Sequence, residues 1–211
     1  MADVNRIGIF GGAFDPPHVA HQAMARAALA QYKLDLLRVI PTGSAWHKAR
    51  PLTDATHRLA MVHLAFDDLQ PSCVDCREIE REGPTYTIDT LTAVRRENPE
   101  AALYLFIGED QARAFKSWHR WEDILQMATV VVAQRPETQD DTASPNFEQW
   151  HNGVSAEVQR LDMTPQAVSA TDIRSRIARG AHLPPLLPLS VQRYIEQHSL
   201  YQTHSDDRLP R

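Results

Sequence analysis

Short apolar runs alternate with longer amphipathic stretches along most of this chain of 211 residues. Apolar runs of about four to eight residues, bounded by polar ones, are typical of buried β-strands. The stretches between them carry apolar residues at the spacing of one helix face, as in Ile88, Leu91 and Val94. We therefore expect strands over 5–10, 35–41, 72–75, 102–107, 129–133 and 158–161, and helices over 18–31, 54–67, 87–97, 119–127, 171–179 and 189–198.

The alternation of strands and helices predicts an α/β fold, a parallel sheet doubly wound by helices on both faces. We expect a single domain over residues 1–201 with a small helical C-terminal part. Polar residues dominate about 136–153, which predicts a surface insertion, and residues 202–211 are typical of a flexible tail. Ligands of such sheets bind beyond the carboxyl ends of the strands, so the loops there are the first place to search for a site.

A pair of glycines, Gly11 and Gly12, directly follows the first predicted strand. Paired glycines let the backbone turn tightly against a ligand. His18 and His21 follow, three residues apart, so we expect both on one face of the next helix near its N-terminus. Free amides and the helix macrodipole attract anions there, and two added imidazoles suit a polyphosphate. The alternative is a tight turn whose histidines are merely exposed.

The residues between the glycines and the histidines predict how this helix begins. Asp15 is a candidate N-cap, and Pro16 or Pro17 fits a first turn, where no amide donor is needed. The loop matches neither the dinucleotide fingerprint nor the P-loop pattern. The expected ligand therefore comes from the chemistry of the loop and not from either of these motifs.

A second candidate anion site lies about 150 residues later, in the segment from Val168 to Arg174. Ser169, followed three residues later by Asp172, resembles a capping box at the start of a helix. Two hydroxyls, from Ser169 and Thr171, together with Arg174 one turn into the helix, also form a device for binding phosphate. Capping and phosphate binding are compatible, so both are predicted.

Composition and charge limit the class of partner. The chain is 43% hydrophobic and 23% charged, as expected for a globular protein, and its formal net charge is −5. This balance gives no electrostatic footprint for nucleic acid or an anionic membrane, so positive charge at a phosphate site has to be local. We find neither a signal-like start nor an apolar stretch long enough to span a bilayer, and we expect a cytoplasmic protein.

Two cysteines, Cys73 and Cys76, form a C-x-x-C pair. Such a pair can be half of a zinc site or a redox dithiol. No second pair of ligands with zinc spacing is evident, and the pair falls within or just after a predicted strand instead of opening a helix after one. We therefore expect inert thiols and no metal site formed by protein ligands.

Together the motifs carry a resemblance to a known family. The pattern Gly-Gly-x-Phe-Asp-Pro-x-His-x-x-His, with Ser-x-Thr-x-x-Arg far downstream, resembles the nucleotidyltransferase superfamily related to class I aminoacyl-tRNA synthetases, which has a Rossmann-like fold. Over nearly its whole length the chain is similar to bacterial nicotinate-nucleotide adenylyltransferases. The further matching blocks are Ile40-Pro41 with His47-Lys48, Arg58–Met61, Gly83–Leu91, Phe106–Asp110 and Trp118–Ile124.

The resemblance implies adenylyl transfer from ATP to nicotinate mononucleotide, giving deamido-NAD and pyrophosphate. It also implies Mg²⁺ carried by the ATP phosphates, a monomer or homodimer, and His18, His21 and Arg174 as catalytic residues. The residues it implies for ATP binding are Gly11, Gly12, Ala13, Phe14, Gly108, Asp110, Ser169 and Thr171. Relatives mostly have Thr or Ser at Ala13 and often Gly at Ala20, so these two positions depart from the pattern.

The resemblance assigns the mononucleotide to a separate group of residues: Thr42, His47, Lys48, Thr85, Tyr86 and Trp118. Each has another interpretation. Trp118 stacks on the pyridine ring or packs between helices; Thr85 and Tyr86 meet the carboxylate or only begin a helix, with Thr87 as a possible cap. His47 and Lys48 contact phosphate or form a solvated pair.

Two further residues, Asp110 and Arg58, each have two interpretations. Asp110 is either near the ribose of ATP or a helix cap, and Arg58 either contacts the mononucleotide or forms a salt bridge on a helix surface. Two functions compete with the favoured one. They are another adenylyl- or cytidylyltransferase of the superfamily and a nucleotide-binding sensor without turnover.

Overall fold

The computed structural model describes residues 4–43, 51–133, 158–164 and 166–202. Within them, six parallel strands form one sheet in the order β3-β2-β1-β4-β5-β6. The predicted doubly wound α/β fold is confirmed, with every predicted strand present within two residues. The strands are β1 (Arg6–Gly12), β2 (Leu36–Pro41), β3 (Ser72–Val74), β4 (Ala102–Gly108), β5 (Thr129–Ala133) and β6 (Val158–Leu161).

The order of the strands reverses beside β1. From β1 the chain moves outward through β2 to β3, then returns to the other side of β1 and continues from β4 to β6. Loops that leave β1 and β4 therefore diverge at this point, which in open α/β sheets is where the ligand-binding crevice lies, at the carboxyl edge of the strands. Phe10 is paired with Phe106, so two residues further on Gly12 and Gly108 end their strands side by side.

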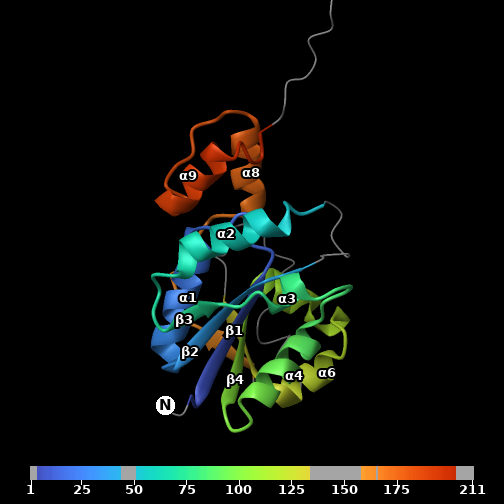
Figure 1. Ribbon diagram of the computed structural model, residues 1–211. Helices are drawn as coiled ribbons and strands as arrows, with labels where there is room; N and C mark the ends of the chain where they lie inside the picture. The colour runs from blue at the N-terminus through green and yellow to red at the C-terminus, as the bar shows by residue number, and fades with distance from the viewer. Residues whose placement is uncertain (1–3, 44–50, 134–157, 165, 203–211) are drawn as a thin grey trace, which may run out of the picture.

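Helices cover both faces of the sheet (Figure 1). On one face, α1 (Val19–Tyr32) and α2 (Ala55–Phe66) bury Met24, Met61 and Phe66 against Phe10 and Val39. On the other face, α4 (Thr87–Glu97), α5 (Glu109–Ala114) and α6 (Trp121–Met127) pack on a second cluster. That cluster contains Ile7, Ile9, Ile88, Leu91 and Ile124. The apolar spacing read from the sequence is thus the spacing of the buried helix faces.

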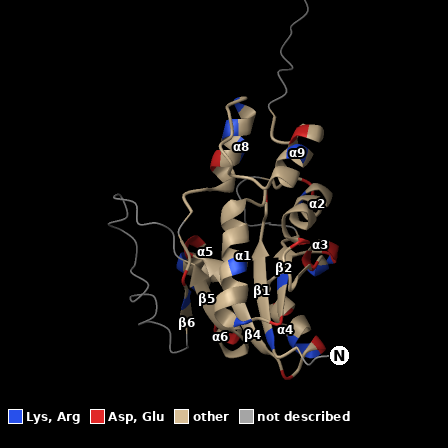
Figure 2. Ribbon diagram, turned by 90° about the vertical axis from the view of Figure 1, so that its left-hand side faces the viewer, with Lys and Arg blue, Asp and Glu red and all other residues tan. Residues whose placement is uncertain are grey.

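The predicted helical C-terminal part consists of α8 (Ala170–Ala178) and α9 (Leu189–Gln197). Both lie beyond the carboxyl end of the sheet, above α2 in Figure 1 and next to the upper end of α1 in Figure 2. Ile173, Val191 and Ile195 join the cluster under α1 and α2, so this helix pair shares a core with the sheet.

Three short elements were not predicted: α3 (Arg77–Glu80), α5 and the 3₁₀ turn η1 (Phe115–Ser117). They are too short to show a helical period, which needs several turns to be recognised. The expected insertion over about 136–153 lies outside the described residues, as does nearly all of the expected tail. None of the described helices combines the length and the apolarity that a membrane-spanning segment needs.

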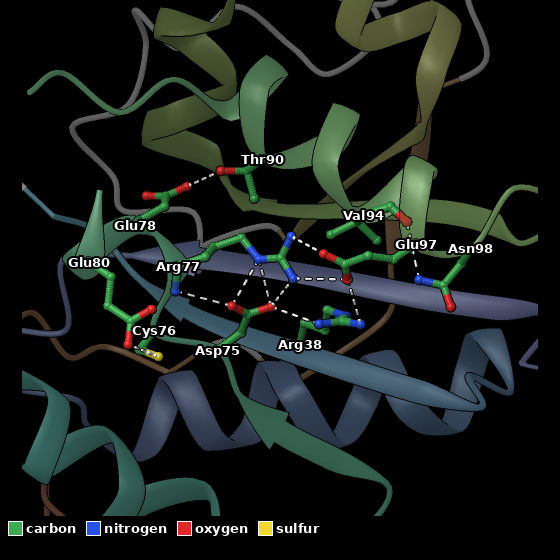
Figure 3. Close-up of polar contacts among 10 residues, drawn as sticks. All are labelled: Arg38, Asp75, Cys76, Arg77, Glu78, Glu80, Thr90, Val94, Glu97 and Asn98. Carbon is green, nitrogen blue, oxygen red and sulfur yellow. Dashed lines mark hydrogen bonds and ion pairs between the residues drawn. The ribbon is translucent and has the colours of Figure 1, made fainter. Parts of the chain in front are cut away.

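An ion-pair network holds α3 and α4 against the sheet (Figure 3). Asp75, directly after β3, accepts hydrogen bonds from Arg38 on β2 (2.8 Å) and from the Nε of Arg77 (2.8 Å). Both arginines also reach Glu97 in the last turn of α4, at 3.1 and 3.0 Å. Burial alone raises the pKa of Asp75, but the hydrogen bonds from Arg77 and Arg38 outweigh it and lower the pKa. The network therefore fixes the helices that flank one end of the crevice.

Candidate active site

Gly11 and Gly12 were expected after the first strand but are its last two residues, paired with Ile40 and Pro41. The glycine loop continues from them at the point where the strand order reverses. A Cβ built on Gly11 meets no atom within 4 Å, so the backbone is open to an approaching ligand at this residue. Phe14 has a φ of 45°, a left-handed conformation that is uncommon for a bulky residue, and its ring lies in the core against Phe10 and Phe66. A nucleotide could therefore contact Phe14 only through its backbone.

His18 and His21 stand at the N-terminus of α1, as predicted. His18 is the N-cap residue and His21 lies in the first turn. Their rings stack with centroids 3.7 Å apart and planes inclined by 18°. The backbone N–H of His18 donates to Nδ1 of His21 at 3.1 Å, so a neutral His21 carries its proton on Nε2. The pair is thus a built unit and not two independent exposed side chains.

Burial lowers the pKa of His21 well below its ordinary value of 6.5, and the neighbouring His18 lowers it further. Phe10 and Phe14 face the His21 ring at centroid distances of 6.1 and 5.0 Å. At neutral pH His21 is therefore an uncharged N–H donor. Such a donor can stabilise developing negative charge without carrying a full positive charge into the ground state.

Asp15 does not cap α1, because the helix begins later than expected and His18 occupies the cap position. Nor do Pro16 and Pro17 lie in its first turn. Asp15 is instead 2% exposed and accepts hydrogen bonds from the Thr53 amide (3.3 Å) and the Tyr201 hydroxyl (2.7 Å). Its carboxylate thus joins three distant parts of the chain.

Arg58 is buried in α2, where its guanidinium hydrogen bonds to backbone carbonyls. Nη1 donates to Ala13 (3.1 Å) and Thr42 (2.7 Å), Nη2 to Gly43 (3.2 Å) and Nε to Thr53 (2.9 Å). The expectation of a helix-surface salt bridge was wrong, since a buried planar fork of donors holds the loop after β1 to the loop after β2. The sequence around an arginine does not show whether its side chain is buried or exposed, so this role could not be predicted.

The segment predicted as the second anion device lies at the start of α8, where the expected helix start is confirmed. Ser169 is the N-cap, and its hydroxyl accepts from the Asp172 amide at 3.2 Å, whereas the Asp172 carboxylate pairs with Arg176 at 2.8 Å. Arg174 donates to the Thr171 hydroxyl at 3.1 Å. Its other terminal nitrogen donates to the Asp15 carbonyl at 2.6 Å. The helix start and the glycine loop, 159 residues apart, are therefore in direct contact.

Gly108 and Asp110 lie at the end of β4 and in the first turn of α5. Gly108 is the N-cap of α5, and its amide donates to the Gln111 side chain at 2.9 Å. Asp110 is exposed and does not take the cap position that was its second interpretation. Both residues flank the glycine loop because β4 is the neighbour of β1.

Thr42 and Thr85 lie on the side of the crevice that α3 and α4 form. Glu78 on α3 accepts from the Thr90 hydroxyl at 2.7 Å and also hydrogen bonds to Thr42, and burial raises its pKa. A Cβ on Gly43 would come within 2.1 Å of the Glu78 carbonyl oxygen, so this close approach requires glycine. The Thr85 hydroxyl is buried and has no hydrogen-bond partner within the described part of the chain.

Tyr86 lies next to the segment that carries Trp118. Tyr86 is the N-cap of α4, and its ring lies 4.5 Å from that of His119, the residue after Trp118. Trp118 is partly exposed and contacts Phe115 at a centroid distance of 5.2 Å. Thr87 begins α4 but is not its cap. His47 and Lys48, the other two residues expected here, lie outside the described residues.

Among the described residues, no group of three or more His, Cys, Asp and Glu is arranged to hold a metal ion. Cys73 and Cys76 are both free thiols; burial raises the pKa of Cys73, and a hydrogen bond to Glu80 raises that of Cys76. Raised pKa values disfavour the thiolate, the reactive form of cysteine.

The chain is similar in sequence to proteins of a known family. A family model described as cytidylyltransferase-like matches residues 9–176. A probable nicotinate-nucleotide adenylyltransferase of Albidiferax ferrireducens is 50% identical and covers 95% of this chain and 100% of its own length. One from Bordetella petrii is 42% identical over 94% of this chain and 100% of its own.

Solved structures share the fold at lower identity. The nicotinic acid mononucleotide adenylyltransferase of Plasmodium falciparum complexed with NaAD has a TM-score of 0.73 at 18% identity, over 93% of this chain and 97% of its own. A putative nicotinate-nucleotide adenylyltransferase of Vibrio parahaemolyticus has a TM-score of 0.67 at 20% identity, over 94% of this chain and 96% of its own. At this identity the likeness is one of fold.

Proposed function

This chain belongs to the nicotinate-nucleotide adenylyltransferases within the cytidylyltransferase-like family, and we propose that it transfers the adenylyl group of ATP to nicotinate mononucleotide. The products are deamido-NAD and pyrophosphate. The observation that carries the proposal is the match to relatives over essentially their whole length. The fold supports it, because two anion-binding devices meet at the switch point of a Rossmann-like sheet.

For ATP, the proposal uses the loop after β1 and the start of α8. The backbone of Gly11, Gly12, Ala13 and Phe14, with the imidazoles of His18 and His21, receives the triphosphate. Ser169, Thr171 and Arg174 hold the β- and γ-phosphates from the other side. Support comes from the direct contact between these two segments. Gly108 and Asp110 lie beside the adenosine half, next to β1 in the sheet.

For the mononucleotide, the proposal uses Thr42, Thr85, Tyr86 and Trp118. The backbone amides of Thr85 and Tyr86, at the N-terminus of α4, suit the nicotinate carboxylate. Trp118 offers an indole face to the electron-poor pyridine ring. The buried Thr85 hydroxyl without a partner among the described residues supports a polar contact with a ligand here.

The reaction is an in-line displacement. An oxygen of the mononucleotide 5′-phosphate attacks the α-phosphorus of ATP, a new P–O bond forms, and the bond to the β-phosphate oxygen breaks as pyrophosphate leaves. The nucleophile is already an anion, so no covalent enzyme intermediate is needed. The protein has to align two polyanions and stabilise the charge that develops between them. Neutral His21 suits this as a donor at the oxygens that gain charge.

Magnesium enters the proposal as part of the substrate, MgATP. The Asp15 carboxylate, the acid nearest to the glycine loop in sequence, is occupied by Tyr201 and Thr53. In this proposal phosphate oxygens and water supply the ligands of the ion, as Mg²⁺ readily permits. The proposal also includes action in the cytoplasm as a monomer or homodimer, which cell fractionation and gel filtration with light scattering test.

A panel of phosphorylated acceptors tests the function. Purified protein is incubated with ATP or CTP and with nicotinate mononucleotide, nicotinamide mononucleotide, phosphopantetheine or glycerol 3-phosphate, and pyrophosphate is measured. We expect the highest kcat/KM with ATP and nicotinate mononucleotide. Preference for another pair would assign a different transferase activity, and binding of ATP without pyrophosphate from any acceptor would favour the sensor.

A further inference from the structure

The C-terminal segment returns to residues 15–19 three times. Arg174 on α8 donates to the Asp15 carbonyl at 2.6 Å. The Leu186 carbonyl, between α8 and α9, accepts from the Val19 amide at 3.0 Å. After α9, the Tyr201 hydroxyl donates to the Asp15 carboxylate at 2.7 Å. Residues 15–19 connect the glycine loop to the stacked histidines, so the whole C-terminal segment is docked on that connection.

Tyr201 makes the last of these contacts in an unusual conformation. Its φ is 66°, and Ser199, two residues earlier, has a φ of 50°. A tyrosine in the left-handed region is uncommon and costs energy, so the surrounding structure has to compensate for it. The backbone beyond α9 thus turns in a way that brings the phenol to Asp15, which is 2% exposed.

Asp15 is the residue on which both halves of the ATP site depend. Its carbonyl accepts from Arg174, which belongs to the α8 device, and its carboxylate accepts from Tyr201 and from the Thr53 amide. Burial and the neighbouring Asp15 raise the pKa of Tyr201, so the phenol remains a donor throughout the physiological range. A charge-assisted hydrogen bond of this kind is among the stronger ones in proteins.

We propose that Tyr201 is a positioning residue for ATP: through its hydrogen bond to Asp15 it fixes the distance between the start of α1, which carries His18 and His21, and the start of α8, which carries Arg174. This inference rests on the proposed function, since it assumes that both devices bind the same triphosphate. When the protein site is already assembled before the ligand arrives, binding does not have to pay the entropic cost of ordering the site. Tyr201 therefore acts through Asp15 and touches no reacting atom.

The test compares two tyrosine-to-phenylalanine variants in the full chain. Tyr201→Phe removes the hydroxyl that bonds to Asp15. Tyr194→Phe is the matched control, because Tyr194 lies in α9 and its hydroxyl bonds to His57 (3.0 Å) on α2. Each variant is characterised by the dissociation constant for MgATP from calorimetry, by kcat and by KM for both substrates.

For Tyr201→Phe we expect the dissociation constant for MgATP to rise about tenfold, the scale set by losing one hydrogen bond to a charged group. The KM for the mononucleotide should change by less than about twofold, because its site lies on the other side of the crevice. Tyr194→Phe should leave both values near wild type. An unchanged MgATP affinity in Tyr201→Phe, or an equal loss in Tyr194→Phe, would overturn the proposal.

A double-mutant cycle with Asp15→Ala tests whether Tyr201 acts through Asp15. In that background Tyr201→Phe should have no further effect on MgATP affinity, whereas independent action would give additive losses and contradict the inference. Far-UV circular dichroism verifies that each variant is folded. The binding measurement needs no acceptor. If the wild-type protein binds MgATP but no acceptor yields pyrophosphate, the proposed function fails while the role of Tyr201 is still decided.

Discussion

Nη1 of Arg58 lies 3.1 Å from the carbonyl oxygen of Ala13, 45 residues earlier in the chain. The same guanidinium holds Thr42, Gly43 and Thr53, so one side chain replaces water for four backbone carbonyls between β1 and α2. Buried carbonyls without donors are costly, which makes this arginine a structural requirement of the loops that follow β1 and β2.

We predict that Arg58→Lys lowers the free energy of unfolding by about 2–4 kcal/mol, because an ammonium cannot serve four carbonyls in the fork geometry of a guanidinium. Urea unfolding followed by circular dichroism measures the loss. Arg193→Lys on the exposed surface of α9 is the control and should stay within about 0.5 kcal/mol of wild type. Equal stabilities of the two variants would mean that the four hydrogen bonds are not needed.

His21→Ala tests the chemistry at the start of α1. If the Nε2 proton of neutral His21 stabilises charge in the transition state, kcat should fall by about 10²–10³, the effect of losing one oxyanion-type donor. The KM for ATP should change much less. Steady-state kinetics with varied ATP separates the two quantities. A near-normal kcat with a raised KM for ATP would make His21 a binding residue only.

The lowered pKa of His21 predicts a pH dependence of stability. In the unfolded chain His21 takes up a proton as the pH falls through 6.5, whereas the folded protein does not until a lower pH. The unfolded state therefore binds more protons in this window, and stability falls as the pH decreases below 6.5. Above pH 6.5 this contribution is constant.

Urea unfolding at a series of pH values from about 7.5 to about 5 measures this dependence. His21→Gln, which cannot titrate, should lose part of the decline below pH 6.5. His63→Gln serves as the control, since His63 is an exposed residue on α2 that pairs with Asp67. A wild-type curve that superimposes on that of His21→Gln would show that the His21 pKa is not shifted by folding.

The sequence predicted the parts of the site that depend on local chemistry. Histidines at a helix start and Ser169 as a cap both follow from short-range rules, and the structure has them in their expected elements. The two glycines, expected just after the first strand, are instead its last two residues. The apolar periodicity likewise located every strand, because burial on a parallel sheet imposes that pattern.

The sequence could not predict the contacts that join these parts. Asp15 has the residue type of an N-cap, yet Tyr201, 186 residues away, and Thr53 occupy its carboxylate. Arg58 has the residue type of a surface charge, yet it is 2% exposed. Both depend on which segments the fold brings together, and local propensity contains no information about that. The family pattern included Arg58 within a matching block and suggested contact with the mononucleotide, not the backbone contacts that the structure shows.

Trp118 presents a choice that kinetics can decide. Its ring lies against Phe115 and is partly exposed, so packing and stacking on a ligand are both consistent with its position. For Trp118→Ala we expect the KM for nicotinate mononucleotide to rise by about tenfold or more, since an aromatic stacking partner is worth about 1–3 kcal/mol. The KM for ATP should stay within about twofold of the wild-type value.

Trp118→Phe is the matched control, because it keeps an aromatic face while it loses the indole. It should recover most of the affinity for the mononucleotide if the pyridine ring stacks on this side chain. If the alanine variant instead raises both KM values by the same factor and lowers the unfolding midpoint, then Trp118 only packs η1 against α6. The mononucleotide site would then have to rely on the N-terminus of α4 alone, and Thr85→Val, which removes the buried hydroxyl, would become the more sensitive variant.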